Sequence, residues 1–198
     1  MAAAMGSAGS SDLQMNAIRF RLITSNRWIV GQTATIHRRL IDLLNSENTE
    51  SLAAQDVGIL QQGLPPQPVD EGADWASVNT SAVILAIPQE ETINPTVPRD
   101  PHMWVKKQPA RAKVGVGPYE LTGNVHVPDG CELDRGFLEV RVKFIAMTTV
   151  SIRRVDDPTF LEEQSVVIVN KAHIDYVMRS VAAPTFKFEE EWSYVYST

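Results

Sequence analysis

Cysteine is almost absent from this chain. The 198 residues include a single cysteine, Cys131, so neither an internal disulfide nor a cysteine-based zinc cluster can form. One unpaired cysteine is compatible with a reducing compartment. Residues 1–15 lack the basic start and the apolar run of a secretory signal. We therefore expect a disordered tail at 1–15 and a cytoplasmic location.

Long hydrophobic runs and an excess of positive charge are also lacking. No run of about 18 apolar residues occurs, which excludes a membrane-spanning helix. Lys and Arg number 18 against 24 Asp and Glu, a net charge of -6, which argues against general binding of nucleic acid. Hydrophobic residues make up 43% of the chain, enough for a core in one domain or two small ones.

The residue patterns of known catalytic and metal sites are missing as well. The four histidines, at positions 37, 102, 126 and 173, do not fall at metal-ligand spacing. No nucleophile elbow or phosphate-binding loop occurs. Gly115-Val116-Gly117 lacks the third glycine of a dinucleotide site. We expect no enzyme activity, no metal, no cofactor and no small-molecule substrate.

Two stretches of the chain, 18–88 and 113–180, share an order of features. Three pairs of residues lie at a nearly constant separation: Gly31 and Gly123 are 92 apart, Asp42 and Asp134 are 92 apart, and Asn79 and Asn170 are 91 apart. A constant offset is the mark of an internal repeat. The sequence therefore predicts a duplicated unit of about five strands.

Strand patterns outnumber helix patterns in both stretches. Residues 137–152 alternate, with Leu138, Val140, Val142 and Phe144 on one face. The one fair helix candidate is His37–Asn45, and its counterpart carries Gly136, which disfavours a helix there. We predict a mainly β protein of two tandem small β-barrels, with one or two short helices.

The domain boundaries follow from composition. We expect the first barrel at 16–88, a Pro-rich linker at 89–112 and the second barrel at 113–181. Residues 61–76 and 153–164 are rich in loop-forming residues and are predicted to be long loops between strands.

One motif in the second stretch resembles the closing motif of Sm-like barrels. Val167–Val177 reads as a hydrophobic strand, a polar knuckle with Lys171 and His173, and a second strand. The Hfq type of bacterial Sm-like protein is the most similar, and residues 78–84 keep the shape without the Lys or the His. The resemblance implies Sm-like or SH3-like barrels that form rings or pairs. It also implies RNA binding through Asn170, Lys171 and His173.

The C-terminal residues 182–198 concentrate aromatic side chains at even spacing: Phe186, Phe188, Trp192, Tyr194 and Tyr196. This period predicts a strand with the rings on one face. The strand would dock on the protein's own core or pair with another chain.

We therefore predict a non-enzymatic scaffold that mediates protein–protein assembly, with this aromatic strand as its docking element. The partner would be another protein or a further copy of the chain, and no membrane is involved. The alternative prediction is an Sm-like RNA-binding protein.

Overall fold

The computed structural model describes residues 16–35, 39–46, 49–61, 67–68, 72–91, 106–139 and 141–179. The elements of the first half are β1 (Asn16–Ile23), β2 (Arg27–Thr35), α1 (Leu40–Leu44), β3 (Ser51–Gln61), β4 (Gln67–Pro68), β5 (Ala73–Asn79), a 3₁₀ turn (Thr80–Ala82) and β6 (Leu85–Glu91). Those of the second half are β7 (Lys107–Val116), β8 (Tyr119–Pro128), α2 (Leu133–Glu139), β9 (Phe144–Arg154), β10 (Leu161–Asn170), a 3₁₀ turn (Lys171–His173) and β11 (Ile174–Arg179). The predicted mainly β class with two short helices is confirmed.

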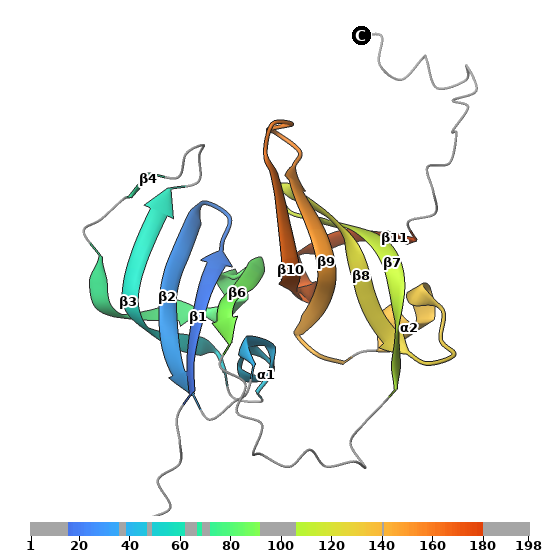
Figure 1. Ribbon diagram of the computed structural model, residues 1–198, viewed down its shortest axis with the longest axis horizontal. Coiled ribbons are helices and arrows are strands. Elements are labelled where there is room, and N and C mark those ends of the chain that lie inside the picture. The colour runs from blue at the N-terminus through green and yellow to red at the C-terminus, as the bar shows by residue number, and fades with distance from the viewer. Residues whose placement is uncertain are drawn as a thin grey trace, which may run out of the picture.

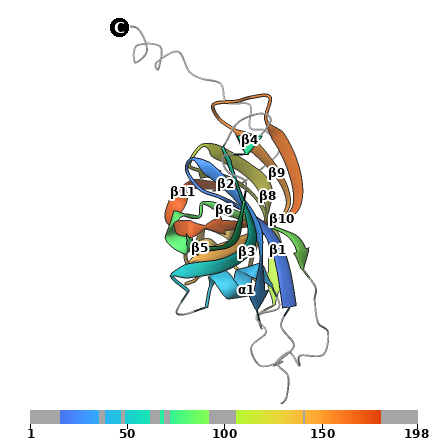
Figure 2. The ribbon, with the colours of Figure 1, turned by 90° about the vertical axis from the view of Figure 1, so that its left-hand side faces the viewer.

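All the described strands belong to one antiparallel sheet. Its order is β11-β7-β8-β9-β10-β6-β1-β2-β3-β4, and β5 pairs with β3 beside β4. Within the described residues no pairing joins the two ends of this order, so the sheet does not close into a barrel. The sheet is folded into two lobes, β1–β6 with α1 and β7–β11 with α2, which lie side by side in Figure 1. In Figure 2 the first lobe faces the viewer.

The two lobes repeat one another in element order and in strand order. Leaving aside the two-residue β4, each lobe has two strands, a helix, two strands, a 3₁₀ turn and a last strand. The strand orders are β5-β3-β2-β1-β6 in the first lobe and β10-β9-β8-β7-β11 in the second. This agreement supports the duplication that the residue offsets predict.

A bulge recurs at the same place in both lobes. The strand register shifts between Val30 and Gln32 in the first lobe and between Thr122 and Asn124 in the second. At the shift one glycine, Gly31 or Gly123, faces two residues of the next strand, so the extra residue belongs to β3 or β9. Such a bulge bends its strand and increases the local twist.

Two other features mark this bulge. The facing strand holds Asp56 in the first lobe and Thr149 in the second, with φ of 49° and 52°. These are the two non-glycine residues with positive φ among the described residues. A Cβ atom on Gly123 would lie 3.1 Å from the carbonyl oxygen of Thr148, and one on Gly31 would lie 3.1 Å from that of Gln55. A side chain at either position would therefore press on the facing backbone, which favours glycine there.

Replacing Gly123 with valine should cost about 1–3 kcal/mol of stability, because the new side chain meets backbone that cannot move away freely. Chemical denaturation of Gly123→Val measures this cost. Gly58→Ala is the comparison, since a Cβ there would meet a side-chain methyl of Val30 at 3.0 Å but no backbone atom within 4 Å. Equal stability of the parent and Gly123→Val would show that the bulge does not depend on glycine.

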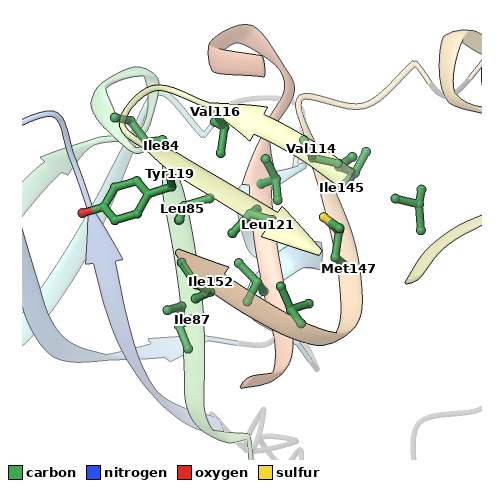
Figure 3. Close-up of a cluster of buried hydrophobic side chains, with 14 of the residues drawn as sticks. Ile84, Leu85, Ile87, Val114, Val116, Tyr119, Leu121, Ile145, Met147 and Ile152 are labelled. Atoms are coloured by element: carbon green, nitrogen blue, oxygen red, sulfur yellow. The ribbon is translucent and has the colours of Figure 1, made fainter. Parts of the chain in front are cut away.

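The hydrophobic core is shared between the lobes. The larger cluster places Ile84, Leu85 and Ile87 of the first lobe against residues of the second lobe, as Figure 3 shows. The second-lobe members labelled there are Val114, Val116, Tyr119, Leu121, Ile145, Met147 and Ile152. The smaller cluster is mostly first-lobe but includes Phe144 and Ile168. Each lobe thus completes the core of the other.

One of the two helices differs from the sequence prediction. The helix predicted within His37–Asn45 is present as α1, whose buried Leu40 and Leu44 pack against the core; residues 37 and 38 lie outside the described residues. A strand was expected from residue 137, but Leu133–Glu139 forms α2 and β9 begins only at Phe144. Gly136 favours this helix because it lets α2 approach β8: a Cβ there would lie 2.7 Å from Cβ of Val127.

The strands also extend into the expected linker and loops. β6 continues to Glu91, and β7 begins at Lys107, so the ends of 89–112 are strand. Pro109 is tolerated in β7 because β11 pairs with β7 only from Ala112 onward, which leaves this part of β7 on an edge. Residues 73–76, expected to be loop, belong to β5. The predicted tails 1–15 and 182–198 lie outside the described residues.

Ile168 lies at the centre of the sheet. It is buried and pairs with Ala146 of β9 on one side and Ala86 of β6 on the other. Ile168→Ala should therefore lower the free energy of unfolding by about 2–5 kcal/mol. Denaturation with urea measures the loss, and Val155→Ala in an exposed turn is the control. A change below about 1 kcal/mol at position 168 would contradict this central placement.

Candidate interaction surfaces

Asn170 is a buried side chain at the junction of the two lobes. Its Oδ1 accepts a hydrogen bond from the backbone N–H of Ala172, which caps the 3₁₀ turn. Its Nδ2 donates to the carbonyl oxygen of Val83 at 2.8 Å, and its backbone N–H donates to that of Ile84. Asn170 thus satisfies two carbonyls of the first lobe.

The other two knuckle residues also contact the protein itself. Nζ of Lys171 donates to the carbonyl oxygen of Phe137 and lies 5.1 Å from the centre of the Phe137 ring. Nε2 of His173 lies 2.8 Å from the carbonyl oxygen of Ser81 in the first lobe. The structure brings Asn170, Lys171 and His173 together and gives each a structural partner, while RNA binding by them stays a prediction.

The remaining reactive side chains are dispersed. Nε2 of His126 lies 2.9 Å from Oγ1 of Thr148, and Cys131 is half-buried. Within the described part of the chain, no three His, Cys, Asp or Glu residues come together as a metal site would require.

The two lobes are joined where β10 pairs with β6. The main-chain pairing is short, with Ile168 opposite Ala86 and Val169 opposite Leu85. Polar side chains extend this joint. Asn45 beside α1 donates to the carbonyl oxygen of Phe144 and accepts from its N–H, both at 2.9 Å, which pairs a side-chain amide with a backbone amide of β9.

A second group of contacts lies on the other side of the joint. Arg21 forms an ion pair with Glu162, and its guanidinium lies 4.9 Å from the centre of the Trp28 ring. Nε1 of Trp28 donates to the Tyr119 hydroxyl at 3.4 Å, and Phe160 packs edge-on against both rings. Burial raises the pKa of Tyr119 above its ordinary value.

The outer strands β11 and β5 occupy the same places in their lobes as the two strands that join the lobes, β6 and β10. By element order, β11 is the counterpart of β6, and β5 is the counterpart of β10. Among the described residues β11 pairs only with β7, and β5 only with β3. Each therefore has one unpaired edge.

Equivalent residues on β6 and β11 show the effect of this difference. Leu85 and Ile87 on β6, the strand that pairs with β10, are 0% and 1% exposed and lie in the larger core cluster. Their counterparts 91 residues later, Tyr176 and Met178 on β11, are 39% and 47% exposed. The same positions are thus apolar in both lobes but covered in only one.

The other end of the sheet also exposes an aromatic side chain. Trp75 on β5 is 62% exposed. Sequence reasoning missed it because the surrounding proline and glycine residues suggested a loop. The combination of a lone Trp with the alternating Ala73–Asn79 was the available indication of an edge strand.

Tyr176 is fixed on the surface of the second lobe. Its ring covers Gly115, where a Cβ would lie 2.2 Å from Cε1 of the ring. Its hydroxyl donates to Oε2 of Glu120 at 3.0 Å, and Nζ of Lys113 lies 2.7 Å from the same oxygen. The Lys113 ammonium holds the pKa of Glu120 below its ordinary value, and burial with the Glu120 contact raises the pKa of Tyr176.

The lowered pKa of Glu120 predicts a pH-dependent contribution to stability. The folded chain binds a proton at Glu120 less readily than the unfolded chain, so this contribution is present at neutral pH. It is lost as pH falls through the folded-state pKa. Glu120→Gln should therefore destabilise the protein at neutral pH and have less effect in acid.

Urea unfolding at several pH values tests this expectation. In a Lys113→Met background the effect of Glu120→Gln at neutral pH should shrink, because the main partner of the carboxylate is gone. An effect of Glu120→Gln that is the same at neutral and acidic pH would contradict the assignment.

Comparisons with known proteins return no match among family models, curated proteins or solved structures. None of the described helices is both long enough and apolar enough to span a bilayer.

Proposed function

We propose that the protein is a non-enzymatic assembly module whose copies join head to tail through the unpaired edges of β5 and β11. The observation that carries this proposal is the joint inside the chain. There the fourth strand of one lobe, β10, lies beside the last strand of the other, β6. The unpaired edges are the fourth strand of the first lobe and the last strand of the second.

The same contacts can form between copies. In the joint, Asn170 donates from its side chain to the carbonyl of Val83. Asn79, the counterpart of Asn170, caps its own 3₁₀ turn in the same way by accepting from the N–H of Ser81, and it is exposed. In an assembly Asn79 would donate to the carbonyl of Ile174, the counterpart of Val83, on the next copy.

Exposed apolar side chains lie where such a contact would cover them. Trp75 lies on β5, and Tyr176 and Met178 lie on β11. An unpaired strand edge is a template for pairing with another chain. A head-to-tail contact of this kind closes into a ring or extends into a filament, depending on the rotation between copies.

The duplicated strand order supports a relation of each lobe to small Sm-like or SH3-like barrels. Each lobe has five main strands, a bulge that bends its second and third strands, and a 3₁₀ turn before its last strand. RNA binding by Lys171 and His173 remains the alternative proposal. Its support is the clustering of these two side chains at one knuckle.

Light scattering after size exclusion tests the assembly. The nuclease-treated parent should have a mass above that of one chain, falling on dilution. Trp75→Lys and Met178→Lys should each lower this mass, because lysine on a strand edge opposes pairing. Val155→Lys is the matched control, since Val155 is an exposed apolar residue in a turn.

Mixing the two edge variants makes the test specific for head-to-tail contact. Trp75→Lys leaves β11 intact and Met178→Lys leaves β5 intact, so an equimolar mixture should form a dimer that neither variant forms well alone. A parent that stays monomeric at all concentrations would overturn the proposal. A mass that disappears with nuclease treatment would favour the RNA alternative.

A further inference from the structure

A hollow on the second lobe lies between α2 and β11 and is lined mainly by apolar side chains. Leu133 and Phe137 come from α2, and Ile174 and Val177 come from β11. We call this hollow the α2–β11 groove. Its volume is about 430 Å³, within the range of sites that hold ligands or side chains.

The apolar side chains of the groove extend the larger core cluster to the surface. Phe137, Ile174 and Val177 are each partly buried and pack against the larger core cluster. Three exposed charged residues, Glu132, Asp134 and Arg179, also line the groove. Among the described residues nothing covers the apolar floor. An apolar floor beside exposed charged side chains is the form of a surface that binds an aromatic segment.

We propose that the groove binds the C-terminal segment of the same chain, anchored by Phe186 and Phe188. Arg179, the last residue of β11, itself lines the groove, so the following 19 residues start at its edge. Phe186 is seven residues beyond Arg179 and can reach about 23 Å from it. The groove is therefore within reach of both rings.

The composition of the segment fits this occupant. Residues 180–198 hold five aromatic residues of the chain's 6 Phe, 4 Tyr and 4 Trp. Large aromatic side chains gain most from burial. Lys187, between the two Phe residues, complements the carboxylates of Glu132 and Asp134.

Tethering favours this occupant over a free peptide. A segment joined by a linker of six residues has an effective concentration in the millimolar range, so a weak aromatic contact suffices. Residues 180–185 form this linker. The groove shares Ile174 and Val177 with β11, the strand whose unpaired edge is used in the proposed assembly. Docking of the segment is inferred from the groove lining and the residues that follow it and does not rest on that assembly.

The single cysteine gives a direct test on the full-length chain. Cys131 lines a second hollow that shares Leu133 and Arg179 with the α2–β11 groove. A nitroxide attached to Cys131 should broaden the NMR signals of Phe186 and Phe188. Val177→Ser in the groove should restore those signals. The control Met178→Ser, the next residue on the same strand, should leave them broadened.

A second measurement needs no label. In the full-length chain, changing both Phe186 and Phe188 to Ser should shift the amide signals of Ile174 and Val177, while Tyr196→Ser should not. Unbroadened signals of Phe186 and Phe188 in the labelled parent would overturn the proposal, and so would broadening that persists in Val177→Ser.

A mixing experiment separates this proposal from docking between copies. Spin-labelled chains without isotope are mixed with ¹⁵N-labelled chains that carry Cys131→Ser. Docking within one chain leaves the ¹⁵N signals of residues 186–188 sharp. Broadening in this mixture would show that the groove binds a second copy, which contradicts the proposal.

Discussion

The pairing of β10 with β6 is the contact on which the rest of the structure depends. It makes one sheet from two lobes and places Leu85 and Ile87 in the larger core cluster, among residues of the second lobe. Only two residue pairs face each other across this joint. Its specificity therefore comes from side chains that bind backbone carbonyls, with Asn170 on one side and Asn45 on the other. The Asn170 bond is buried and the Asn45 bond is partly buried, and each pairs a side-chain amide with a backbone carbonyl, so neither polar group is left without a partner.

The shared core explains why the duplicated lobes are not interchangeable. Phe144 and Ile168 of the second lobe belong to the smaller, mostly first-lobe cluster, and Trp28 of the first lobe packs with Tyr119 in the larger cluster. A lobe alone would expose these surfaces to water. A chain of this length with two isolated small cores would bury a smaller fraction of its surface than one with a joined core. Joining the lobes thus stabilises both.

Part of this architecture could be predicted from the sequence, and the reasons differ by element. Gly31 and Gly123 revealed the repeat, because close backbone contact at the bulge favours glycine in both lobes. Asn79 and Asn170 also revealed the repeat, because each caps the 3₁₀ turn before the last strand of its lobe. Helix α2 was missed since its glycine, a poor helix former in isolation, packs against Val127. That contact spans the tertiary fold and leaves no local pattern. The exposed edges were missed for the same reason: only the strand order shows which strands end the sheet.

The two free edges are weaker copies of the joint, and this asymmetry fits a reversible assembly. β10 presents Val167, Ile168 and Val169, all buried, whereas β5 presents Ala76, Ser77 and Val78 at the equivalent positions. Less apolar area is then available between copies than within the chain. In the proposed assembly, exposed Trp75 would supply most of the apolar area of β5. On β11, Gly115 and Glu120 hold the Tyr176 ring in position for this contact. A preorganised ring loses little side-chain entropy on binding. In the proposed assembly, the internal joint would therefore persist under conditions in which contacts between copies dissociate.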